Sequence, residues 1–219
     1  MKKYLNILNK CPLFFGIADD DLLRMLGCLG AVVEVFDKKY TIFAEGSRSK
    51  YVGIILSGSA QVVQLDFYGN RSIIQNVGAT ELFGEAFACA EVESLPVSVI
   101  ANEPCEVMFI DCGHILHTCQ NGCGFHHQLI FNLMKALAKK SLQFHERIAV
   151  TSKRTTREKL LAYLNAQSKY FNCNSFVINF DRQELADYLE VDRSGLSAEI
   201  SKLRKEGIID CHKNRFVLL

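Results

Sequence analysis

Short apolar runs separated by turn-forming residues characterise the chain before about residue 125. They are rich in Val, Ile and Phe, which favours β-strands. Gly46, Gly58 and Gly69 lie between runs, where tight turns need a residue that tolerates positive φ. This pattern predicts an antiparallel β-roll or barrel, preceded by a short helix over residues 22–29. The clearest runs are at residues 31–36, 51–56, 60–65 and 107–110.

A long helix without Gly or Pro is predicted over residues 125–150, where apolar residues recur in alternating steps of four and three. One stripe has heptad spacing, which is typical of a parallel dimer seam. A second apolar flank, formed by Leu129, Leu133 and Leu142, is expected to pack on the protein's own roll. The alternative is a helix that buries both stripes against its own domain. The predicted seam consists of Ile130, Met134, Leu137, Ser141, Phe144 and Ile148.

Helix signals return after residue 154. Thr155 and Glu158 have the spacing of a capping box, so a helix is predicted to begin there and to fade at the polar segment 167–175. A short strand over residues 176–180 follows. Asp181 and Glu184 then form a second capping box at the start of another helix.

The last part of the chain predicts a helix-turn-helix followed by a hairpin. After the turn at residues 190–192, a helix over residues 193–205 has its apolar face at Leu196, Ile200 and Leu203. Gly207 ends this helix. Two apolar runs, 208–211 and 216–219, then flank Lys213-Asn214 and predict a basic β-hairpin wing.

The opposite face of this last helix carries small and polar residues, so it can enter the major groove of DNA. Arg193 can pair with guanine in two-pronged fashion, and the serines can donate to bases or phosphates. The competing interpretation is a three-helix packing unit with a solvated charged face. The predicted DNA-binding residues are Arg182, Gln183, Asp192, Arg193, Ser194, Ser197, Ala198, Ser201, Lys202 and Lys213.

Charge is distributed unevenly over the 219 residues, which are enough for two domains. Residues 72–134 contain seven acids and no Lys or Arg, whereas sixteen basic and ten acidic residues follow from Lys135 onward. Only the second part is therefore suited to a polyanion. No signal peptide or membrane-length apolar run is visible, and the nine cysteines are an odd number. We expect a cytoplasmic protein with reduced thiols and no membrane partner.

The sequence resembles the Crp/Fnr family of bacterial regulators over almost its entire length. The most specific run extends from Arg182 to Ser197, and Phe83-Gly84-Glu85 is similar to the opening of the family's phosphate-binding cassette. The resemblance implies an α+β fold: an N-terminal cyclic-nucleotide-binding-like β-roll, a long dimerisation helix and a C-terminal winged helix-turn-helix. The corresponding domains are residues 1–124 for effector binding, 125–150 for dimerisation and 151–219 for DNA binding.

The chain departs from the cyclic-nucleotide-binding members of this family at the cassette. Leu95 and Pro96 stand where those members carry an Arg-Ser or Arg-Thr pair that holds the phosphate, so cyclic AMP is not the expected effector. Thr80 replaces a usual glycine, and Ala198 replaces a frequent basic residue of the recognition helix. A neutral or weakly polar effector is expected instead, bound by Gly84, Glu85, Ala86, Phe87, Leu95, Pro96 and Val97.

Sensing through metal or thiols is an alternative. Cys119, Cys123 and His126 have i, i+4, i+7 spacing and residue types that suit zinc, iron or copper(I), although buried structural cysteines and a surface histidine explain the pattern more simply. Neighbouring thiols could also form a switch disulfide. An iron–sulfur cluster is not expected, because only Cys11 and Cys28 lie near the N-terminus.

Taken together, these features predict a homodimeric, sequence-specific DNA-binding regulator on a near-palindromic operator. RNA polymerase and an unidentified small effector are the other expected partners, although some members of the family bind DNA without an effector. A ligand-binding protein that acts through protein contacts, with a vestigial helix-turn-helix, is the competing class. An enzyme is the weakest interpretation, because the sequence contains no recognisable catalytic motif.

Overall fold

The computed structural model describes residues 1–65, 67, 71–117, 124–178 and 180–219. The chain forms two compact units, Met1–Lys140 and Ser141–Leu219. The boundary falls inside the long helix α5, which spans His126–Thr151. The division into three functional domains stays a prediction.

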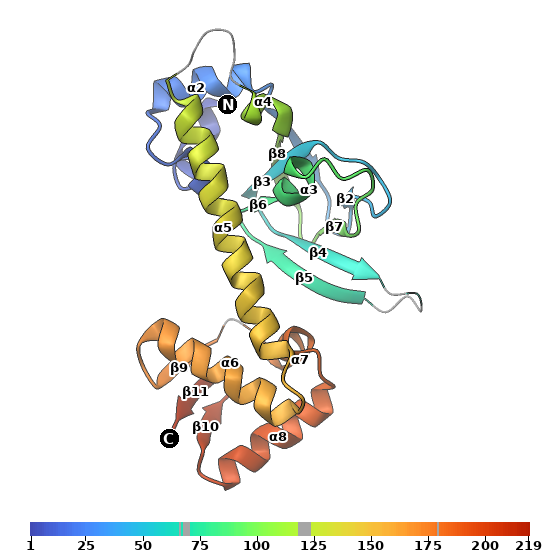
Figure 1. Ribbon diagram of the computed structural model, residues 1–219, viewed down its shortest axis with the longest axis vertical. Helices are drawn as coiled ribbons and strands as arrows, with labels where there is room; N and C mark the ends of the chain where they lie inside the picture. The colour runs from blue at the N-terminus through green and yellow to red at the C-terminus, as the bar shows by residue number, and fades with distance from the viewer. Residues whose placement is uncertain (66, 68–70, 118–123, 179) are drawn as a thin grey trace. The chain divides into compact units, whose positions relative to one another are not determined.

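Two antiparallel four-stranded sheets form the β-roll of the first unit (Figure 1). Successive side chains of a strand point to opposite faces, so the inner faces of both sheets share one core, and the outer face of the first sheet is buried against helices. The predicted strand-rich N-terminal fold is confirmed. In spatial order, one sheet contains β1 (Val32–Phe36), β8 (Cys105–Asp111), β3 (Tyr51–Ser57) and β6 (Leu82–Phe83). The other contains β2 (Thr41–Phe43), β7 (Ser98–Ala101), β4 (Ala60–Leu65) and β5 (Arg71–Val77).

Short helices cover the first of these sheets. The part of α5 that belongs to this unit packs there through Leu129 and Leu133, which are fully buried. Asn132 adds polar attachment, because its Nδ2 donates to the carbonyls of Leu13 at 2.9 Å and Phe15 at 2.8 Å. The other helices are η1 (Lys2–Tyr4), α1 (Leu5–Leu8), η2 (Pro12–Phe14), α2 (Asp19–Cys28), α3 (Glu85–Cys89) and α4 (Cys112–Leu116).

The second apolar flank of α5 is shorter than the sequence predicted. Leu142 is 63% exposed and belongs to the second unit, whereas Leu129 and Leu133 lie in the core of the roll. Packing on the roll therefore uses the N-terminal turns of α5. Leu142 instead adds apolar surface to the exposed part of the helix.

The second unit comprises the C-terminal part of α5, the helices α6, α7 and α8, and a three-stranded antiparallel sheet of order β10-β11-β9. Both predicted capping boxes are present, at Thr155–Glu158 and Asp181–Glu184. The predicted strand at 176–180 is shorter, because Ile178 leaves the ladder and its backbone amide donates to the carbonyl of Asn214. The elements are α6 (Thr156–Phe171), β9 (Ser175–Val177), α7 (Arg182–Leu189), α8 (Arg193–Lys205), β10 (Ile209–His212) and β11 (Arg215–Leu218).

Two turns of the roll adopt left-handed backbone conformations. At Gly58, φ is +76°, and a Cβ atom would lie 2.3 Å from the carbonyl oxygen of Pro104. Thr80 has φ of 74°, although its β-branched side chain disfavours this region. Thr80 therefore has the left-handed backbone conformation that a glycine at this position would adopt more easily. Gly69 lies outside the described residues.

Replacing Thr80 with Gly is expected to stabilise the roll. Relief of the left-handed strain of about 1–2 kcal/mol exceeds the added unfolded-state entropy of glycine, which leaves a net gain of roughly 0.5–1 kcal/mol. Urea unfolding measures the free energy. Gly46→Ala is the matched control, because Gly46 has φ of +82° and open space around it, so this change should destabilise. A lower free energy of unfolding for Thr80→Gly than for the wild type would contradict the inference that the left-handed backbone at Thr80 is strained.

Candidate DNA-binding surface and effector site

The turn between α7 and α8 is held by a left-handed residue at the end of α7 and by a lysine of α6. Glu190 ends α7 with φ of 54°, and Lys159 Nζ donates to the carbonyls of Leu189 at 3.1 Å and Glu190 at 3.2 Å. Sequence patterns did not indicate Lys159, because its partners are backbone atoms of a segment thirty residues away. The lysine satisfies carbonyls that the end of α7 leaves unpaired.

Asp192 caps α8. Its Oδ2 accepts hydrogen bonds from the backbone amide of Gly195 at 2.8 Å and from the Ser194 hydroxyl, and both bonds lower the pKa of the carboxyl. Asp192 and Ser194 were predicted to contact DNA, and the structure gives both side chains a local partner. Their observed contacts hold the first turn of the recognition helix in place.

The two faces of α8 differ as the sequence predicted. Leu196, Ile200 and Leu203 are buried in the core of the second unit. The opposite face exposes small or polar groups, and in it the Ser201 hydroxyl donates to the carbonyl of Ser197 at 2.9 Å. This face therefore has no large apolar side chain to bury. It comprises Arg193, Ser194, Ser197, Ala198, Ser201 and Lys202.

Arg182 connects α7 to the wing formed by β10 and β11. One guanidinium nitrogen donates to the carbonyl of Lys213 at 3.2 Å, and the group lies 5.6 Å from the centre of the Phe216 ring. Lys213 has φ of 55°, so the tip of the hairpin is a tight turn with its side chain exposed. Gln183 is likewise engaged, because its Nε2 donates to Asp187 at 2.8 Å. Arg182 thus orients Lys213.

Several basic residues of the second unit are already paired. Arg157 of α6 forms a bidentate pair with Glu206 and lies 3.5 Å from Glu199, and Arg204 contacts Asp210 at 3.3 Å. Within the described chain, Arg193 and Lys213 are exposed and form no ion pair. Arg193 on α8 and Lys213 on the wing therefore each carry a positive charge that remains available to a polyanion.

The predicted effector site centres on Glu85 at the start of α3. Gly84 precedes it with φ of +78°, and a Cβ atom there would lie 2.9 Å from the Phe43 ring and 3.2 Å from the carbonyl oxygen of Tyr51. Only glycine fits this approach. The turn directs Glu85 inward, where the residue is 1% exposed.

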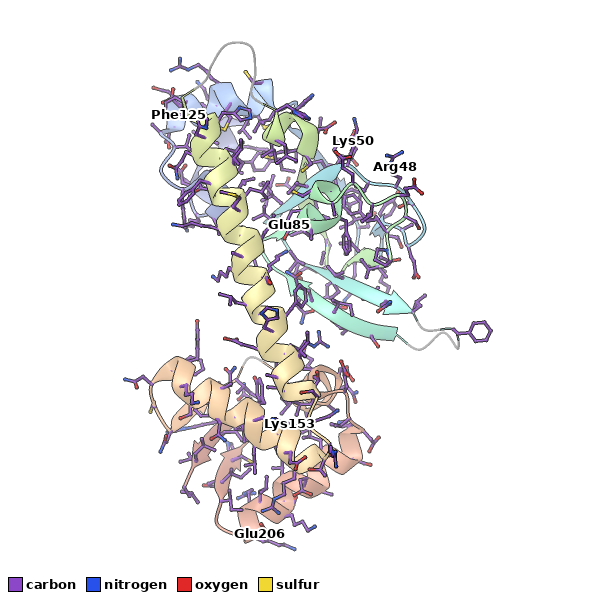
Figure 2. The ribbon with its side chains drawn as sticks, in the orientation of Figure 1. Arg48, Lys50, Glu85, Phe125, Lys153 and Glu206 are labelled. Carbon is purple, nitrogen blue, oxygen red and sulfur yellow. The ribbon has the colours of Figure 1, made fainter. Side chains whose placement is uncertain are left out.

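A lysine of α5 partners this buried carboxylate. Lys140 Nζ lies 2.5 Å from Oε1 of Glu85 and donates to the carbonyl of Leu82 at 2.7 Å. Glu85 is labelled in Figure 2. Among the described residues, Glu85 Oε2 has no hydrogen-bond donor. Lys140 lies just beyond the stretch of residues 72–134 that lacks Lys and Arg, so the charge pattern along the sequence did not indicate it. The surroundings of Glu85 therefore include a cation from another element.

The position of the missing cassette arginine is filled by a buried leucine. Leu95 is 2% exposed, and its backbone forms two hydrogen bonds with residues 46 and 47, of 2.9 and 2.8 Å. The same loop continues to the exposed Arg48, which is labelled in Figure 2. Of the other predicted effector residues, Val97 is buried and Phe87 half-buried, whereas Ala86 and Pro96 are exposed. The predicted set therefore includes both interior and surface positions.

The proposed metal ligands are only partly described. Cys119 and Cys123 lie outside the described residues. His126 is 6% exposed, and its Nε2 is 2.8 Å from the carbonyl oxygen of Ile115. Within the described part of the chain, no group of three potential ligands is present. The metal hypothesis stays a prediction.

Comparison with known families also divides the chain into two parts, an N-terminal and a C-terminal domain of different families. Residues 33–121 match the cyclic nucleotide-binding domain family, and residues 158–219 match the Crp-like helix-turn-helix domain family. No curated protein matches the chain significantly. In the described residues, no helix has both the length and the apolar character that a membrane crossing requires.

Solved structures show the same fold at low sequence identity. The regulator CLP of Xanthomonas campestris, described as c-di-GMP responsive, is 16% identical over 91% of this chain and 99% of its own, with a TM-score of 0.67. CprK complexed with OCPA is 12% identical over 90% and 88%, with a TM-score of 0.69. FixK2 of Bradyrhizobium japonicum is 17% identical over 86% and 92%, with a TM-score of 0.58.

The fold is that of a DNA-binding transcription regulator. Its β-roll matches an effector-binding domain family, and its winged helix-turn-helix matches the Crp-like family. The chain belongs to the Crp/Fnr family, because the cyclic nucleotide-binding domain model and the Crp-like helix-turn-helix model together match more than half of it. The matched families are those of regulators rather than enzymes.

Replacing Lys140 with Met is expected to destabilise the first unit by about 2–3 kcal/mol, because Glu85 would remain buried without its cation. Urea unfolding followed by circular dichroism measures this loss. Lys139→Met is the matched control, since Lys139 is the exposed neighbour on α5, and its change should stay within about 0.5 kcal/mol. Adding Glu85→Gln to Lys140→Met should restore most of the stability. Equal stability of the two lysine variants would argue against the ion pair.

Proposed function

We propose that the protein is a homodimeric, sequence-specific transcription regulator that responds to a small effector other than cyclic AMP. The observation that carries the proposal is the exposed, small and polar face of α8, which Asp192 caps at its N-terminus. In a helix-turn-helix this position presents early residues of the second helix to base edges.

Base recognition is assigned to Arg193 and Ser197. Arg193 is exposed at the first turn of α8 and is long enough to pair with guanine in two-pronged fashion. Ser197 lies one turn further along the same face. Lys202 and Lys213 would contact phosphates on either side, which adds affinity without sequence preference. Ala198 offers only a methyl group, which suits contact with thymine.

Dimerisation is assigned to the exposed stripe of α5. Met134 is 56% exposed, Phe144 43% and Ile148 60%, which is unusual for apolar residues spaced at heptad intervals. Ile130 and Leu137 are half-buried, and Ser141 is exposed. A second copy of the helix would cover these positions. Two recognition helices on one dimer would then require half-sites about one helical turn apart on a near-palindromic operator.

The effector is assigned to the region around Glu85 and Leu95. A buried carboxylate with one unsatisfied oxygen suits a hydroxyl or amine donor, whereas Leu95 supplies an apolar wall where a phosphate ligand would need a cation. An effector that competes for Glu85 would also alter the contact of Lys140 on α5, and so could bias the helix between two arrangements. Recruitment of RNA polymerase stays a prediction.

The DNA-binding assignment predicts that Arg193→Ala weakens binding by about 5- to 150-fold, which corresponds to roughly 1–3 kcal/mol. Fluorescence anisotropy on a duplex selected from random sequences by the purified protein measures the affinity, with nonspecific DNA as competitor. Ser197→Ala should reduce selectivity further in the double variant.

Lys169→Ala is the control for loss of one positive charge, because Lys169 is exposed on α6 and away from the recognition face. Its effect should stay within about twofold at physiological salt. Unchanged occupancy after Arg193→Ala and Ser197→Ala together would remove the proposed recognition role and favour regulation through protein contacts.

The dimer assignment predicts that Ile148→Glu weakens self-association at least about tenfold, because an unpaired carboxylate would face an apolar seam. Sedimentation equilibrium measures the association constant. Gln143→Glu is the matched control, since Gln143 is exposed on α5 outside the seam and keeps a good helix former. Wild-type protein that remains monomeric at micromolar concentration would contradict the assignment.

A further inference from the structure

Two cysteines meet beside the effector region. The sulfur of Cys89, at the end of α3, lies 3.3 Å from the sulfur of Cys112, at the start of α4. They are far apart in sequence, and the analysis of motifs had not paired them. Among the described cysteines, this is the one pair whose sulfur atoms are in contact.

The two thiols have different surroundings. Cys89 is partly exposed, whereas Cys112 is 2% exposed and lies in the apolar core. The hydrogen bond between the thiols lowers the pKa of Cys89, although burial and the Glu85 carboxylate oppose this effect. The same bond, together with burial, raises the pKa of Cys112. Cys89 is therefore the accessible member with more thiolate character, and Cys112 is the resolving thiol.

A buried cysteine elsewhere in the first unit provides the contrast. Burial raises the pKa of Cys11 to about 12, and no cysteine sulfur contacts it among the described residues. Such a thiol is expected to be inert. The expected reactivity of Cys89 therefore comes from its partial exposure and its contact with the Cys112 sulfur, both of which Cys11 lacks in the described structure.

We propose that Cys89 and Cys112 form a reversible disulfide when the protein meets a hydroperoxide. The sulfur atoms need to approach by only roughly one ångström, and α3 is a short helix of five residues with Cys89 at its last position. The bond would join the helix that carries Glu85 to the helix that directly follows β8.

The chemistry balances in two steps. The Cys89 thiolate attacks one oxygen of hydrogen peroxide, the O–O bond breaks, and after proton uptake the products are Cys89 sulfenic acid and water. The Cys112 sulfur then attacks the Cys89 sulfur, the S–O bond breaks, and its hydroxyl leaves as water with the Cys112 proton. Two thiols are oxidised by two electrons, and one peroxide is reduced to two waters.

Peptide mapping of the full-length protein tests this assignment. Protein reduced with dithiothreitol and freed of reductant is treated with hydrogen peroxide, and the remaining thiols are alkylated under denaturing conditions. Trypsin is unsuitable, because residues 72–134 contain no Lys or Arg and both cysteines stay on one fragment. Cleavage after Glu releases Cys89 on residues 86–91, and chymotrypsin, by cutting after Leu116, separates Cys112 from Cys119.

The expected product is one cross-linked fragment that joins Cys89 to Cys112, lacks two hydrogens and disappears on renewed reduction. Cys89→Ser and Cys112→Ser should each abolish it, whereas a Cys119→Ser/Cys123→Ser variant and a Cys28→Ser/Cys173→Ser variant should retain it. Cross-linking of Cys89 to another cysteine would overturn the proposal. So would over-oxidation of Cys89 while Cys112 remains a free thiol.

An alkylation rate distinguishes this pairing from mere proximity. In the native, reduced protein, Cys112→Ala should slow the reaction of Cys89 with iodoacetamide several-fold near neutral pH, because the thiol that hydrogen-bonds to Cys89 is lost. Circular dichroism confirms that the variant remains folded. An unchanged rate would contradict the asymmetric roles of the two sulfurs.

A regulatory consequence rests on the proposed function. Oxidised wild-type protein should bind the selected operator with an affinity at least about threefold different from that of reduced protein, and Cys89→Ser should show no such difference. If the disulfide forms and the affinity is unchanged, the modification site stands and its regulatory role is overturned. If neither redox state selects DNA, the proposed function fails independently of the disulfide.

Discussion

The ion pair between Glu85 and Lys140 imposes a constraint on the first unit. A carboxylate at 1% exposure needs a cation, and the cation comes from α5 rather than from the roll itself. The left-handed turn at Gly84 aims the carboxylate inward, and Leu129 and Leu133 hold the helix in place for the lysine to reach it. The short helix α3, which carries Glu85, is thereby linked to the long helix α5 by an ion pair.

Local signals in the sequence were sufficient for the second unit. Capping boxes, the apolar face of α8 and the turn at Lys213 depend on residues within a few positions of one another, so spacing alone specifies them. Lys159 is the exception. It holds the turn of the helix-turn-helix by bonding to backbone carbonyls of a distant segment, and no side-chain pattern reveals such a partner.

The effector region was less predictable, because its contacts join distant segments. The sequence indicated the Gly84-Glu85 turn and the loss of the cassette arginine, but Lys140 reaches Glu85 from 55 positions along the chain. The loop that carries Arg48 likewise contacts a distant segment, because its residues 46 and 47 form backbone hydrogen bonds with Leu95. The charge counted along residues 72–134 therefore omitted the cation that another element contributes to the surroundings of Glu85. The prediction that Leu142 packs on the roll was wrong for a related reason. An apolar stripe on a helix does not reveal how far along the helix the neighbouring domain extends, and Leu142 is exposed.

Family membership constrains the two units unequally. The fold as a whole is shared with solved structures at only 12–17% identity, and the second unit carries the match to the Crp-like helix-turn-helix domain family. Ligand choice depends instead on a few buried side chains, and the named ligands of the similar structures already differ, from c-di-GMP to OCPA. In this chain the region around Glu85 contains a half-satisfied carboxylate, a lysine and two touching thiols. The same roll can therefore keep its role as a sensor while the chemistry that it senses changes one side chain at a time.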